Sequence, residues 1–122
     1  MAIKNALRLR ARIKASANEL TTLLSEYVES GKIYCIQQVA WEIDAVLSGG
    51  NTRARLYIEG HGYKHFIEEQ QNPAADNLYT YDDPIWLIPR ERLAIEFDHA
   101  ANNATAEMDL TGYWTELKEG IQ

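Results

Sequence analysis

Two histidines near the middle of the chain have a spacing that could bind a metal ion. His61 and His65 are four residues apart, and two imidazoles at this spacing on one helix face can share a metal. Gly60 and Gly62 flank His61, however, and oppose a helix. On a strand the two side chains would lie about 13 Å apart, which is too far for one ion. The sequence therefore predicts exposed or hydrogen-bonded strand histidines and no metal site.

Acidic side chains gather in the segments that contain Glu68, Glu69, Asp76, Asp82 and Asp83. Their oxygens would suit calcium, but neither segment has the alternating Asp/Asn spacing and closing Glu of a calcium loop. A glycosidase needs two carboxylates at a fixed separation, and no spacing distinguishes two acids among the 18 in the chain. We therefore expect solvated loop acids, with a carboxylate-pair enzyme as a minor alternative.

Cys35 is the single cysteine of the chain, so the sequence has neither an internal disulfide framework nor a cysteine-rich zinc site. Its place in an alternating segment predicts a small buried hydrophobic residue rather than a nucleophile. No positioned base supports nucleophilic catalysis, and the Gly49-Gly50 pair matches no phosphate-binding fingerprint. The sequence thus predicts no catalytic residue, no metal and no cofactor, and it favours a protein that is not an enzyme.

Positive charge is concentrated in the first 18 residues, which contain no acid and five basic side chains: Lys4, Arg8, Arg10, Arg12 and Lys14. The other 104 residues contain 7 basic and 18 acidic side chains, so their net charge is −11. Such an asymmetry marks a segment that binds something acidic. Nucleic acid would be held through its phosphates, but the acidic body would repel it. We prefer an arm that docks on the acidic body of a neighbouring copy, with a soluble, frayed arm as the alternative.

Three aromatic residues, Tyr79, Tyr81 and Trp86, lie in or beside a long polar connection over residues 70–84. Tyrosine and tryptophan commonly anchor protein interfaces, and this is the preferred interpretation. A platform that stacks sugars or bases is the alternative.

Alternation of apolar and polar residues dominates the chain after the basic segment. In residues 33–43 we assign one face to the interior, and it holds Ile33, Cys35, Gln37, Val39, Trp41 and Ile43. Residues 85–114 contain two further alternating runs. Residues 20–28 are interpreted as a strand, although their spacing also fits a helix.

Turn signals separate these runs at residues 48–51, at the paired glycines around His61 and at residues 89–92. About seven candidate strands at this spacing predict an all-β, antiparallel, jelly-roll-like β-sandwich. We assign the sandwich to residues 19–122 and a basic arm or short helix to residues 1–18, because residues 2–15 fit helical and alternating templates about equally. No apolar run is long enough to span a membrane, and the single cysteine fits folding in a reduced compartment.

Several segments together resemble small β-sandwich virion proteins of tailed bacteriophages. They are Ser-Gly-Lys at 30–32 before an aromatic strand, Arg-Leu-Tyr-Ile-Glu-Gly at 55–60, Ile-Pro-Arg-Glu-Arg-Leu-Ala-Ile-Glu-Phe at 88–97 and Leu-Thr-Gly-Tyr-Trp at 110–114. The resemblance spans about residues 20–115 and rests on strand and turn patterns. Arg90 departs from it, because such proteins usually have glycine in this turn, so a turn of another type is expected.

The resemblance implies a non-enzymatic virion subunit, present in many copies as a head-decoration, head-fibre or tail-attached protein and folded in the host cytoplasm. Its partners would be other virion proteins and copies of itself, without a membrane. Nucleic acid would be reached only through the N-terminal arm. A carbohydrate-binding module that uses the three aromatic residues is the alternative function.

Overall fold

The computed structural model describes residues 4–15, 20–46 and 52–117. These residues form nine strands and no helix. The described part of the chain therefore contains no helix that could span a membrane. The strands are β1 (Asn5–Lys14), β2 (Thr21–Leu24), β3 (Lys32–Ile43), β4 (Arg53–Gly60), β5 (Tyr63–Gln71), β6 (Tyr79–Tyr81), β7 (Ile85–Leu87), β8 (Glu91–Asp98) and β9 (Thr105–Glu116). The predicted turn at 48–51 lies outside the described residues.

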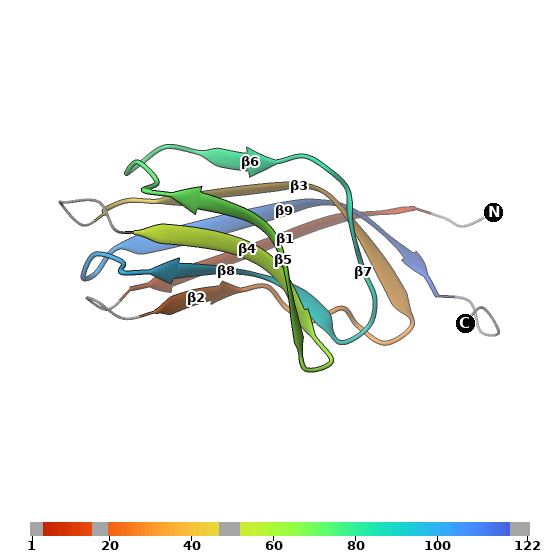
Figure 1. The fold of residues 1–122 in the computed structure, drawn as a ribbon. Helices are drawn as coiled ribbons and strands as arrows, with labels where there is room; N and C mark the ends of the chain where they lie inside the picture. The colour runs from red at the N-terminus through yellow and green to blue at the C-terminus, as the bar shows by residue number, and fades with distance from the viewer. Residues whose placement is uncertain (1–3, 16–19, 47–51, 118–122) are drawn as a thin grey trace.

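The strands form two antiparallel sheets that pack as a sandwich (Figure 1). The first sheet has the order β1-β9-β3-β6, with β7 also paired to β3, and the second has the order β2-β8-β4-β5. β1 and β2 are in contact on one lateral side of the sandwich, and β5 faces β6 and β7 on the other. The predicted antiparallel β-sandwich is confirmed.

The basic N-terminal segment is an edge strand of the first sheet rather than a projecting arm or a short helix. All ten residues of β1 pair with β9. Leu7, Leu9 and Ile13 pack against the core, and the basic side chains between them stay exposed. The local sequence fits a helical and an alternating pattern equally well, and pairing with β9 decides in favour of the strand. Strand formation depends on neighbouring strands more than on the intrinsic β-propensity of the residues.

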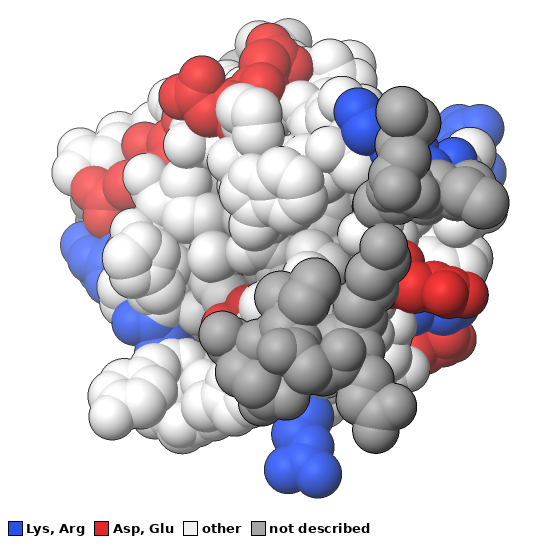
Figure 2. Space-filling view, turned by 90° about the vertical axis from the view of Figure 1, so that its right-hand side faces the viewer, with Lys and Arg blue, Asp and Glu red and all other residues white. Residues whose placement is uncertain are grey.

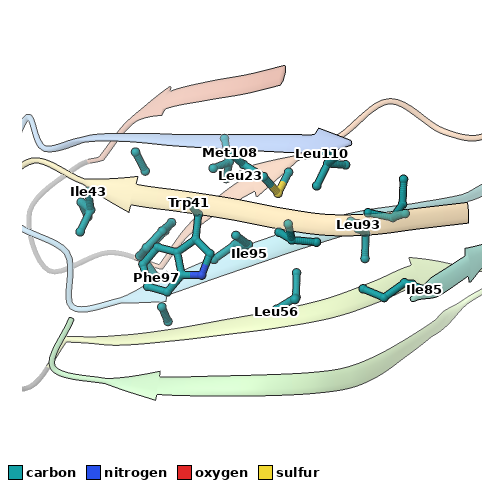
Figure 3. Close-up of a cluster of buried hydrophobic side chains, with 14 of the residues drawn as sticks. Leu23, Trp41, Ile43, Leu56, Ile85, Leu93, Ile95, Phe97, Met108 and Leu110 are labelled. Atoms are coloured by element: carbon teal, nitrogen blue, oxygen red, sulfur yellow. The ribbon is translucent and has the colours of Figure 1, made fainter. Parts of the chain in front are cut away.

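Side chains from both sheets fill the interior, as Figure 3 shows for the central strands. Phe97 of β8 meets Trp41 of β3 edge to face, with 5.7 Å between the ring centroids. Leu93 and Ile95 of β8 and Leu110 of β9 are fully buried beside them. These residues lie on the apolar faces that the alternation predicts, so the core follows from the sequence along β8 and β9.

A β-bulge between Ile36 and Gln38 interrupts the alternation of side chains along strand β3. After the bulge, Val39, Trp41 and Ile43 point into the core as predicted. A bulge inserts one residue into a strand, so the alternation of faces shifts by one position on its two sides.

Before the bulge, the predicted assignment of faces is wrong. Tyr34 and Ile36 belong to the core, whereas Ile33 and Cys35 do not. Gln37 is the additional residue and is exposed. Cys35 is buried, as predicted, but on the outer face of the sheet.

Gly112 of β9 lies opposite this bulge. A Cβ atom at this position would collide with the carbonyl oxygen of Cys35. Glycine in a strand often marks such a close approach of backbone. The Leu-Thr-Gly-Tyr-Trp segment therefore carries a packing requirement that β3 imposes.

Two turns place residues in the left-handed region of backbone conformation. His61 and Gly62 join β4 to β5 with φ angles of 52° and 82°, as a two-residue type I′ hairpin turn requires, which confirms the predicted tight bend. Arg90 has a φ of 71°, a conformation that glycine adopts with least strain. Its backbone N–H donates a hydrogen bond to the carbonyl oxygen of Val28 at 3.3 Å.

Candidate assembly surfaces

The basic residues of β1 form a row along the outer face of the first sheet. The exposed positions of the strand that carry charge are Arg8, Arg10, Arg12 and Lys14. Alternate residues of a strand stand about 6.6 Å apart, so the four charges extend along the whole edge. Lys4 precedes the strand, and its Nζ lies 4.6 Å from the centre of the Tyr113 ring.

Two of these basic residues form ion pairs with the neighbouring strand β9. The Arg10 Nε donates a hydrogen bond to Asp109 at 2.9 Å, and Arg12 pairs with Glu107. The Arg10 and Arg12 side chains nevertheless remain 68% and 73% exposed, so each pair contributes less than about 1 kcal/mol. Within the described part of the chain, Arg8 has no ion-pair partner.

The far edge of β1 is open. β9 pairs with one side of the strand, and no described strand pairs with the other. An unpaired edge of ten residues exposes backbone N–H and C=O groups that another chain can pair with, and basic side chains on the edge limit indiscriminate pairing.

Tyr79 and Tyr81 face the interior of the sandwich. Tyr79 stacks on Trp41 with 4.6 Å between ring centroids, and its hydroxyl accepts a hydrogen bond from the backbone N–H of Ala74 at 2.8 Å. Tyr81 also packs against the core. Packing within one subunit therefore accounts for Tyr79, whereas Tyr81 also lines a groove.

Trp86 faces the opposite way. Its neighbours Ile85 and Leu87 are buried in the core, so the alternation of β7 turns Trp86 outward, where it is 55% exposed. Its ring meets Tyr113 edge to face, with 6.0 Å between centroids. Tyr79 therefore does not share a surface with Trp86, whereas Tyr81 and Trp86 both line the groove described below.

Cys35 lies beneath Trp86 and Tyr113, since it is paired with Trp86 of β7 and with Tyr113 of β9. The pKa of Tyr113 is raised, mainly by a hydrogen bond with the Cys35 side chain and to a smaller extent by desolvation. Alternation alone missed this outward-facing cluster because the bulge in β3 reverses the faces. Gly112 was the available signal for that bulge.

A groove runs along the other lateral side of the sandwich, between the edge strand β5 and the edge strands β6 and β7. Its volume is about 370 Å³, and its lining combines polar groups with apolar and aromatic residues, among them Phe66, Ile67, Tyr81 and Pro84. Phe66 is 48% exposed. Sequence reasoning did not find this groove, because its walls come from strands of different sheets.

Acidic side chains flank the groove. Glu68 and Glu69 belong to β5, and Asp82 and Asp83 separate β6 from β7. Arg55 donates a hydrogen bond to Glu69 at 2.8 Å, and this bond is the main reason why the pKa of Glu69 is lowered. Among the described residues, no group of three or more His, Cys, Asp or Glu side chains is arranged to hold a metal ion.

The two histidines occupy different settings. His61 lies in the turn between β4 and β5, with its Nε2 at 3.1 Å from the carbonyl oxygen of Pro89. His65 is an exposed residue of β5 and contributes to the groove. Neither lies on a helix, so the spacing that suggested a shared metal has no structural counterpart.

Figure 2 shows one end of the sandwich, where uncharged side chains make up much of the described surface and most acidic and basic side chains lie toward the rim. The beginning of β3, the end of β9 and strand β7 lie toward this end (Figure 1). Exposed apolar residues belong to these segments or follow them directly, among them Trp86, Ile88 and Leu117.

No known protein family and no curated protein matches the sequence. The fold is similar to a chain in the acidic stable capsid structure of Helicobacter pylori bacteriophage KHP30, with a TM-score of 0.65 and 16% sequence identity over 98% of this chain and 100% of that one. A crystal structure of FLHE gives a TM-score of 0.40 and 10% identity over 88% of this chain and 97% of that chain. A structure of infectious bursal disease virus Gt strain gives 0.37 and 7% identity, over 96% of this chain and 43% of that chain. At these identities the likeness to the phage chain is one of fold.

Proposed function

We propose that this chain is a non-enzymatic structural protein of a tailed-phage virion, which assembles in multiple copies as a capsid-decoration, head or neck–tail component. The observation that carries the proposal is the similarity to a chain of a phage capsid structure, which extends over 98% of this chain and the whole of the other. The likeness extends over nearly the whole of both chains rather than over a short shared segment. Because a fold alone does not define a function, the surface must supply a separate argument.

The surface supports assembly through its two lateral sides. One side carries the open edge of β1 with its basic row, and the other carries a groove that is partly lined by apolar residues, with acidic residues nearby along the chain. Open edges are a liability in an isolated sandwich, and contact with other virion proteins or with further copies would cover them. Repeated weak contacts also give avidity without a large single interface.

The five basic residues, Lys4, Arg8, Arg10, Arg12 and Lys14, keep their proposed role in assembly, now with four of them on an edge strand and Lys4 directly before it. Deletion of residues 1–18 would be a poor test, because it would also remove the apolar side chains of β1 from the core. Substitutions that change only charge leave this packing in place. Direct contact with nucleic acid through the same residues would be the competing interpretation.

Mass spectrometry and electron cryomicroscopy of purified particles test the proposal. We expect the chain in stoichiometric, multi-copy amounts in particles, with density for a sandwich at symmetry-related positions on the head, neck or tail. Its absence from purified particles, together with its presence as free protein in the infected cell, would contradict a virion role. Saturable quenching of Trp86 fluorescence by a glycan would instead favour the carbohydrate-binding alternative.

A further inference from the structure

We infer that copies of this chain meet head to tail, with the β1 side of one copy lying along the groove between β5 and β6–β7 of the next. The inference rests on the proposed function, since it names the contact by which a multi-copy subunit would assemble. Three properties of the two lateral sides carry it: their apolar surface, their charge and their lack of self-complementarity.

The β1 side exposes an apolar seam. β1 has ten residues and its neighbour across the sandwich, β2, has four, so the second sheet cannot cover the whole inner face of β1. Leu7, Leu9 and Ile13 are accordingly only half-buried, although they pack against the core. A partner that covers this seam would stabilise the contact in proportion to the apolar area that it removes from water.

The opposite side has a groove with apolar residues in its lining. Ile67, Tyr81 and Pro84 contribute to the groove of about 370 Å³. On the first-sheet side, β6 and β7 have three residues each, so no long strand closes the sandwich here. β5 contributes an open edge of nine residues. An extended strand such as β1 has the length and the apolar side chains to lie along this opening.

The charges beside the two surfaces are opposite. The charged residues of the exposed row on β1 are all basic and include Arg8 and Lys14. Asp82 and Asp83 lie between the groove residues Tyr81 and Pro84, and Glu68 directly follows Ile67. None of these three acids has an ion-pair partner within 4 Å among the described residues. Complementary surface charge steers association and fixes register.

The same charges oppose contacts between identical sides. Pairing β1 with β1 of another copy would bring basic side chains next to basic ones, and contact between two grooves would do the same with acids. Like charges directly opposite each other destabilise a strand pair. A contact between two different surfaces is heterologous, so it generates a closed ring or an open filament rather than a simple two-fold dimer.

Two charge-reversal variants test the inference on the purified full chain. The first carries Arg8→Glu with Lys14→Glu, and the second carries Asp82→Lys with Asp83→Lys. By light scattering, we expect the wild-type chain to form multimers that weaken as salt rises. Each variant alone should associate about tenfold or more weakly, because its altered side no longer offers a net charge opposite to that of its unchanged side.

Mixing the two variants is the decisive measurement. The reversed β1 of the first variant complements the reversed groove of the second, and their unchanged sides also complement each other. An equimolar mixture should therefore recover the wild-type mass in alternating order. Arg8→Glu alone is compared with Arg90→Glu, which makes the same change in net charge away from both sides and should leave association unchanged.

Three results would overturn the contact: a wild-type chain that is monomeric at every concentration, a single variant that assembles like the wild type, or a mixture that does not recover. Circular dichroism of each variant verifies that the sandwich is folded. A monomeric chain that is still found in purified particles would overturn the head-to-tail contact and leave the virion role intact. A chain that assembles head to tail but is absent from particles would support the contact and overturn the virion role.

Discussion

Phe97 and Phe66 lie in the same sheet but in very different surroundings. Phe97, on the central strand β8, is fully buried and meets Trp41 with 5.7 Å between rings. Phe66, on the edge strand β5, is 48% exposed and lies against Tyr57 with 5.1 Å between rings. A central strand has a neighbour on each side and the opposite sheet above it, whereas an edge strand lacks one neighbour. The comparison teaches that stability resides in the central strands and that the edges leave apolar surface free for partners.

Alanine substitution of the two phenylalanines should give the largest difference. Phe97→Ala removes a buried ring and leaves a cavity, so we expect the free energy of unfolding to fall by about 3–5 kcal/mol. Phe66→Ala should change it by less than about 1 kcal/mol, since the ring is half in solvent. Chemical denaturation of both variants measures the difference. Equal losses would mean that the edge strand is as much a part of the core as β8.

The bulge in β3 gives the second prediction, because it is the point at which a central strand behaves irregularly. Gly112→Ala would place a methyl group against the carbonyl oxygen of Cys35, and we expect a loss of roughly 1–3 kcal/mol from the strain of overpacking. Thr111→Ala, one residue earlier on β9, is the matched control and should have little effect. If both variants unfold at the same denaturant concentration, the two strands do not approach each other as closely as the structure shows.

The smallest expected effect concerns charge at the edge strand β5. The hydrogen bond from Arg55 lowers the pKa of Glu69 below its ordinary value of 4.5. A carboxyl with a lowered pKa contributes stability that is present above its unfolded value and is lost as the pH falls through its folded value. Glu69→Gln should therefore reduce the loss of stability on acidification through this range.

Glu68→Gln is the control for this measurement, because Glu68 has no ion pair within the described residues. Thermal unfolding at pH values above and below 4.5 compares the two variants with the wild type. An identical pH dependence for wild type and Glu69→Gln would show that the Arg55 bond is too exposed to matter in solution.

Local alternation was sufficient to predict much of the fold. Leu93, Ile95 and Phe97 repeat at every second position and are buried, so the sandwich class and the inner face of β8 follow from the sequence. For β3 the same argument holds only after the bulge. Before the bulge, Cys35 lies on the outer face although alternation assigned it inward. The inserted residue shifts the alternation by one position, so a pattern that is correct after the bulge is reversed before it.

The candidate surfaces were predicted less completely than the core. The basic row of β1 is evident in the sequence as a cluster of charge, but its form as an edge strand depends on β9, which lies about 100 residues further along the chain. Trp86 is exposed, whereas Tyr79 packs on Trp41, and the interface role predicted for both stays a prediction. Which face a short edge strand presents depends on its register with a neighbour, and register is a property of the assembled sheet.

The sequence by itself determined the all-β class, the buried alternating residues of the central strands, the tight turn at His61-Gly62 and the separation of basic from acidic segments. These depend on side-chain polarity and on backbone preferences, which are local. Only the tertiary structure decided that residues 5–14 form an edge strand, that Cys35 lies under Trp86 and Tyr113, and that a groove with acidic flanks lies across the sandwich from a basic edge. Those features arise where strands distant in sequence meet, because hydrogen bonding between strands and packing between sheets set which surfaces are covered and which remain open.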